Sequence, residues 1–66
     1  MKEIYVKYIA SYLQVKDWQV ENCVTLFEEG CTIPFISRYR KERTDGLDDE
    51  QVAGIKHWTD VFTEME

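Results

Sequence analysis

Apolar residues recur along the chain at the three- and four-residue intervals of an α-helix, in four separate segments. The segments span about 3–14, 17–29, 34–43 and 48–66. No stretch alternates with the two-residue period of a strand for long enough to form one. The pattern therefore predicts an all-α fold, a small bundle of about four short helices in a helix-turn-helix-like arrangement with short connecting turns.

The first segment carries apolar side chains around more than half of its circumference, which is more than one neighbouring helix can cover. Three tyrosines fall on a single stripe of this helix: Tyr5, Tyr8 and Tyr12. Two interpretations remain open at this point. The stripe completes the local core, or it forms a docking surface for another part of a longer parent chain.

The second segment has local signals at both of its ends. We expect Asp17 to be the N-cap residue, and Gly30 to take the left-handed position just beyond the C-terminus. Glu28 and Glu29 lie at the C-terminal end, where the helix dipole disfavours negative charge. We therefore expect a cation beside them. The face predicted to be buried consists of Val20, Cys23, Val24, Leu26 and Phe27.

Short signals also bound the last two helices. Pro34 suits the start of a helix, with Thr32 as its cap and Ile33 outside it, since a residue before proline avoids the helical region. This helix should end near 42–43 and be followed by a turn at 44–46. The final helix begins with a capping-box spacing between Asp48 and Gln51.

Composition limits the range of functions. The 66 residues form one small domain with a marginal core, and two cysteines and a single histidine cannot assemble a structural zinc site. We expect Cys23 and Cys31 to be reduced thiols rather than a disulfide. No phosphate-binding loop, nucleophile arrangement or metal-ligand cluster occurs, so we expect no enzyme activity, no cofactor and no metal. No signal peptide or membrane span is evident.

Positive charge is concentrated in one short stretch of an otherwise acidic chain. The sequence has 8 Lys and Arg against 13 Asp and Glu, and half of the cations lie within six positions: Arg38, Arg40, Lys41 and Arg43. This cluster is a candidate contact for nucleic acid or for a neighbouring domain. A net charge of −5 works against phosphate binding by the domain as a whole.

Placing the cluster on one continuous helix divides it. Phe35, Ile36 and Tyr39 share a face that we expect to be buried. Arg38 and Arg40 then flank that face on opposite sides, with their stems along the core. Such a placement favours a structural role, in which arginines pair with carboxylates such as those near the end of the preceding helix. Direct contact with nucleic acid remains the alternative.

The run EGCTIPFISRYRKE at 29–42, followed by Thr44, Gly46, Leu47 and Asp48, resembles the N-terminal domain of the Tex family of bacterial transcription accessory proteins. The resemblance extends over essentially the whole chain. Two positions depart from the family pattern: Cys31 stands where alanine is common, and Asp45 where the turn commonly has glycine. Neither change alters the expected fold, because aspartate tolerates a left-handed turn conformation.

The resemblance implies a large, cytoplasmic, multidomain parent with an RNase-H-like domain, helix-hairpin-helix elements and a C-terminal OB-type RNA-binding domain. We therefore expect residues 1–66 to be an N-terminal fragment of such a protein. The chain would serve as a scaffolding or docking module, with the remaining domains as partners, nucleic acid bound through the parent, transcription machinery as a further partner, and no membrane contact. The alternative is an autonomous DNA- or RNA-binding helix-turn-helix unit that uses the basic cluster.

Overall fold

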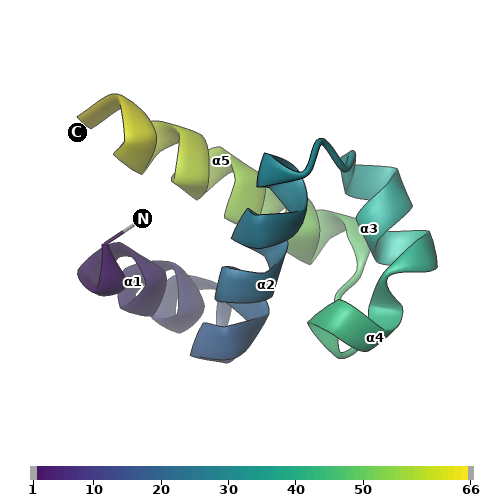
Figure 1. The fold of residues 1–66 in the computed structure, drawn as a ribbon. Helices are drawn as coiled ribbons and strands as arrows, with labels where there is room; N and C mark the ends of the chain where they lie inside the picture. Colours follow the sequence, from purple (N-terminus) through teal and green to yellow (C-terminus); the bar gives the residue numbers. More distant parts are fainter. Residues whose placement is uncertain (1, 66) are drawn as a thin grey trace.

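The computed structural model describes residues 2–65, which form five helices and no strand (Figure 1). The prediction of an all-α fold is confirmed. The helices are α1 (Glu3–Leu13), α2 (Asp17–Glu28), α3 (Ile33–Tyr39), α4 (Lys41–Thr44) and α5 (Asp49–Met65). The count is five rather than four because the third predicted helix is broken into α3 and α4.

The longest helix, α5, packs against α1, α2 and α3, while α4 packs against α2 and α3. Both ends of the chain lie on one side of the molecule, and α3 and α4 lie on the other (Figure 1). Side chains from α1, α2, α3 and α5, with Leu47, form one buried core: Val6, Ile9, Ala10, Val20, Cys23, Leu26, Ile36, Leu47, Val52 and Ile55. No helix within residues 2–65 is long and apolar enough to cross a membrane.

The N-terminus of α2 differs from the prediction. Lys16 is the N-cap residue, and Asp17 is the first residue of the helix. The side-chain Oε1 of Gln19 accepts a hydrogen bond from the Lys16 backbone N–H at 2.8 Å, so a glutamine in the first turn performs the capping. The carboxylate of Asp17 still lies near the N-terminus, where the helix dipole favours it.

Other local signals are confirmed. Gly30 has a φ of +93°, as expected for the left-handed residue after α2. Thr32 caps α3, since its Oγ1 accepts a hydrogen bond from the Phe35 backbone N–H. The cap fixes the helix start at the next residue, so Ile33 is helical, contrary to the prediction. Asp48 caps α5 through a hydrogen bond from the Gln51 N–H at 2.8 Å.

The break between α3 and α4 occurs at Arg40, whose φ of −126° and ψ of 35° are not helical. The predicted continuous helix to 42–43 is therefore wrong. Two side chains of α2 hold the second piece in place, because Gln19 donates to the Thr44 carbonyl at 2.8 Å and Asn22 donates to the Arg43 carbonyl at 2.6 Å. The turn expected at 44–46 is present, with positive φ at Asp45 and Gly46.

The buried face predicted for this region is correct at one residue of three. Ile36 is fully buried, whereas Phe35 is 37% exposed and Tyr39 is 63% exposed. The physical reason lies in the position of α3 at the end of the bundle, where α5 covers a narrow stripe. Ile36 and Ser37 occupy that stripe, and the Ser37 hydroxyl donates a hydrogen bond to Asp49 of α5.

Candidate interaction surfaces

Five aromatic side chains of α1 and α5 form a continuous group, which we call the aromatic face: Tyr5, Tyr8, Tyr12, Trp58 and Phe62. Tyr5 stacks on Phe62 with ring centroids 4.4 Å apart and the rings nearly parallel. Trp58 meets the edges of Tyr8 at 5.5 Å and Tyr12 at 5.2 Å. These pairs bind the first and last helices together.

The three tyrosines of the stripe differ in their exposure to solvent. Tyr5 is half-buried and stacks on Phe62 of α5. Tyr8 is 47% exposed and Tyr12 is 63% exposed, so their outer surfaces face solvent. Ile4 at 70% and Met65 at 68% extend this apolar surface toward the ends of the two helices. The docking role of the stripe stays a prediction. The rings of Tyr8 and Tyr12 are exposed on one side and contact Trp58 on the other.

The sequence alone did not assign Trp58 and Phe62 to this surface. Both residues are half-buried on α5. Their spacing of four residues matches that of Tyr8 and Tyr12, which is the signal that two helices can interleave aromatic rings. Recognising it requires knowing that α1 and α5 are neighbours.

The four basic residues of the cluster make no ion pair with any carboxylate in the described part of the chain, where the two ion pairs are Lys7–Glu3 and Lys56–Asp60. The predicted pairing of arginines with Glu28 and Glu29 is therefore not formed. The break at Arg40 is the cause of the altered geometry, since the angles of a single helix no longer apply.

Arg40 lies against an aromatic ring instead. Its guanidinium carbon is 4.9 Å from the centroid of the Phe35 ring, and Phe35 in turn is 5.4 Å from the Tyr39 ring. Arg38 and Lys41 line a neighbouring hollow of about 260 Å³ at the start of α5. Arg43 is half-buried beside α2. The helix break thus places aromatic rings and cations on the same end of the molecule.

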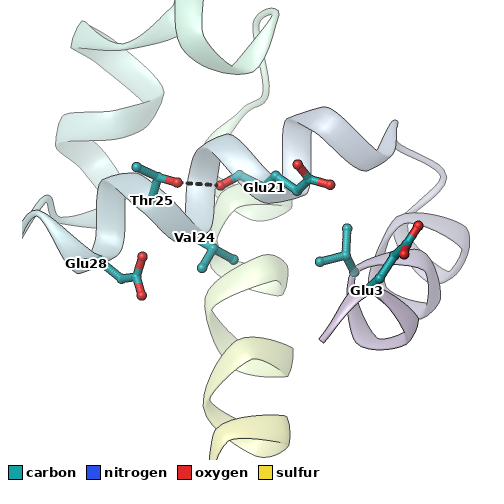
Figure 2. A pocket seen from close by; sticks show the side chains of 6 residues that line it. Glu3, Glu21, Val24, Thr25 and Glu28 are labelled. Atoms are coloured by element: carbon teal, nitrogen blue, oxygen red, sulfur yellow. Dashed lines mark hydrogen bonds between the residues drawn. The ribbon is translucent and has the colours of Figure 1, made fainter. Parts of the chain in front are cut away.

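A hollow of about 440 Å³ lies between α1 and α2, with carboxylates around an apolar floor. Figure 2 shows Glu3 on α1 across from Glu21, Thr25 and Glu28 on α2. The Thr25 hydroxyl donates its hydrogen bond to the Glu21 backbone carbonyl. The hollow combines carboxylates with apolar side chains and a single hydroxyl, so it offers no nucleophile paired with a base.

The residues with reactive or metal-binding side chains are scattered. Among residues 2–65, no three His, Cys, Asp or Glu side chains come together in a way that could hold a metal ion. Cys23 and Cys31 are both free thiols, in line with the prediction of reduced cysteines. Burial raises the pKa of the Cys23 thiol to about 11, so it stays protonated and unreactive at neutral pH.

The fold and these surfaces define a small all-α domain with an aromatic face at one end and a cluster of cations and aromatic rings at the other. Comparison with known proteins identifies the family of this domain. Residues 3–66 match the family model described as "Tex-like protein N-terminal domain". The chain belongs to this family, as the run at 29–42 indicated.

Three relatives show how widely the domain occurs. Protein YhgF of Escherichia coli is 41% identical over 66 residues, which is 100% of this chain and 8% of that protein. Transcriptional accessory protein Tex of Neisseria gonorrhoeae is 42% identical over 48 residues, 73% of this chain and 6% of that protein. S1 RNA-binding domain-containing protein 1 of Homo sapiens is 33% identical over 51 residues, 77% of this chain and 5% of that protein.

The chain thus spans less than a tenth of the length of these relatives. No solved structure matches the chain.

Proposed function

We propose that this chain is a docking module of a transcription accessory protein, and that it binds the remaining domains of its parent through the aromatic face. The observation that carries the proposal is the exposure of Tyr8 and Tyr12 on a base of packed aromatic rings. Tyrosine supplies a large contact area with few rotatable bonds, which makes it a favoured residue at protein interfaces. The module itself catalyses no reaction and requires no cofactor.

The names of the relatives support the wider setting of the proposal. One of them is called a transcriptional accessory protein, and another is named for an S1 RNA-binding domain. The parent of this chain would work in the cytoplasm, bind nucleic acid mainly through other domains, and act with the transcription machinery. Docking by the helical module would hold those domains in a fixed arrangement.

Hydrogen exchange in the full-length parent tests the docking directly. Amide protons around Tyr8 and in the last turns of α5 should exchange more slowly in the parent than in the 66-residue chain, because docking excludes water and suppresses fraying. Exchange in α3 and α4 should be the same in both. Equal exchange rates around Tyr8 in the two proteins would refute the docking role of the aromatic face.

A matched pair of substitutions adds specificity to the test. Tyr12 and Tyr39 are each 63% exposed, but they lie on the aromatic face and on α3 respectively. Tyr12→Ser in the parent should restore fast exchange in α1, while Tyr39→Ser should leave it slow. If both substitutions act alike, the effect reflects general destabilisation and the aromatic face has no special part in docking.

A further inference from the structure

The cations at the α3–α4 end are available to an external anion. Arg38 and Lys41 share their hollow with Asp48 and Asp49, yet no ion pair forms between them. Both carboxylates accept hydrogen bonds from other groups. Asp48 accepts the Gln51 backbone N–H, and Asp49 accepts the Ser37 hydroxyl.

Exposed aromatic rings lie beside these cations. Phe35 and Tyr39 are 37% and 63% exposed, and their centroids are 5.4 Å apart. Arg40 covers Phe35 at 4.9 Å, which leaves the ring of Tyr39 as the more open platform. An aromatic ring next to a guanidinium group is the combination on which unpaired nucleobases stack.

The surface is held rigidly although α3 and α4 are short. Gln19 and Asn22 donate hydrogen bonds from α2 to the carbonyls of Thr44 and Arg43. The Ser37 hydroxyl ties α3 to α5. These contacts hold the backbone on both sides of Arg40, so the backbone positions from which the cations and rings project need not be ordered when a ligand binds.

Charge favours a polyanion at this end of the molecule. Residues 35–43 together with Asp48 and Asp49, which line the hollow of Arg38 and Lys41, contain four cations and three carboxylates, a local charge of +1, whereas the rest of the chain has four cations and ten carboxylates, a charge of −6. The local excess attracts phosphates while the remaining surface repels them. Helices α3 and α4 lie on the side of the molecule opposite the start of α1 and the end of α5 (Figure 1).

The geometry favours a single strand over a duplex. Helix α3 has seven residues, which corresponds to a length of about 10 Å, and its exposed side carries the rings of Phe35 and Tyr39. In a duplex the faces of the bases are hidden in the stack, whereas a single strand can present them to aromatic rings.

We propose that the α3–α4 end binds single-stranded nucleic acid. Tyr39 stacks on a base, and the cations contact the flanking phosphates. We call this the basic-aromatic surface, and it consists of Phe35, Arg38, Tyr39, Arg40, Lys41 and Arg43. The role is separate from docking through the aromatic face, so either one can fail while the other stands.

Fluorescence anisotropy with a short labelled oligouridine tests the proposal on the 66-residue chain, over a series of KCl concentrations. Replacing two phosphate contacts, Arg38→Gln with Lys41→Gln, should reduce the slope of log affinity against log salt by about 1.4, or about 0.7 for each contact. The matched control removes two exposed cations elsewhere, Lys7→Gln with Lys16→Gln, and should leave the slope unchanged. Circular dichroism confirms that each variant is folded.

The stacking contact is tested separately. Tyr39→Ala should weaken oligouridine binding by about 5- to 150-fold, and Tyr39→Trp should retain it. Tyr12→Ala removes an equally exposed tyrosine from the aromatic face and should have no effect.

Four results would each overturn the proposal. These are no binding at the lowest salt concentration, binding to duplex DNA as tight as to oligouridine, an equal effect of the control variants, and equally strong competition by polyglutamate. The last outcome would indicate an acidic protein partner instead.

Discussion

Replacing Gln19 with alanine should destabilise the domain far more than a surface substitution would. The side chain is nearly buried, at 7% exposure, and makes two hydrogen bonds. Its Oε1 caps α2 by accepting the Lys16 N–H, and its Nε2 donates to the Thr44 carbonyl, both at 2.8 Å. The lost cap costs about 1 kcal/mol, and a buried carbonyl left without its donor costs about 1–3 kcal/mol.

The expected loss is therefore about 2–4 kcal/mol. A domain of this size has a total stability of about 3–10 kcal/mol, so the variant should be partly unfolded under mild conditions. Urea titration followed by circular dichroism gives the free energy of unfolding. The fluorescence of Trp18 and Trp58 provides a second probe, and the agreement of both probes checks that unfolding is two-state.

Gln51 offers a matched control within the same chain. It too is the third residue after an N-cap, and its Oε1 accepts the Asp48 N–H at 3.2 Å, but this capping bond is exposed. Gln51→Ala should cost about 1 kcal/mol or less. The difference between the two variants isolates the buried bond to Thr44. Equal losses for Gln19→Ala and Gln51→Ala would refute the claim that α2 holds α4 through this bond.

Two further predictions concern the core. Ile36→Ala should lower the free energy of unfolding in urea by about 2–5 kcal/mol, because the side chain is fully buried. Phe35→Ala should lower it by about 1–2 kcal/mol, because the ring is partly exposed. A larger loss for Phe35→Ala than for Ile36→Ala would contradict this placement of the two side chains. In a Cys31→Ser background, the free energy of unfolding should fall between pH 9 and 11, by up to about 3 kcal/mol relative to a variant that also carries Cys23→Ala. The unfolded thiol ionises near 9.0 and the folded one near 11, so the unfolded state binds fewer protons in this window. Parallel pH profiles for the two proteins would contradict it.

Signals confined to a few neighbouring residues predicted most of the helix ends, although Lys16 rather than Asp17 caps α2 and Ile33 is helical. Thr32, Gly30 and the Asp48–Gln51 pair each form the cap or helix end that their sequence indicates. These features depend on hydrogen bonds within one turn, which a local pattern contains in full.

The break at Arg40 could not be found in this way. The hydrogen bonds that hold α4 come from Gln19 and Asn22, which are 25 and 21 residues distant from the carbonyls they bind. The predicted buried face of this region was wrong for the same reason. A helical wheel identifies Phe35, Ile36 and Tyr39 as one apolar face, but only the arrangement of α3 on α5 decides that Ile36 alone is covered.

The position of α5 in the chain has a consequence for synthesis on the ribosome. Of the five helices in residues 2–65, α5 is made after the other four, yet it packs against α1, α2 and α3 and contributes Val52 and Ile55 to the core. At about 5–20 residues per second, its 17 residues take about 1–3 s to translate. Throughout that time Ile9 and Leu26 have no α5 to cover them. During this time the net charge of the nascent chain or a chaperone would have to prevent aggregation. A ribosome stalled before α5 would leave apolar core residues exposed to solvent.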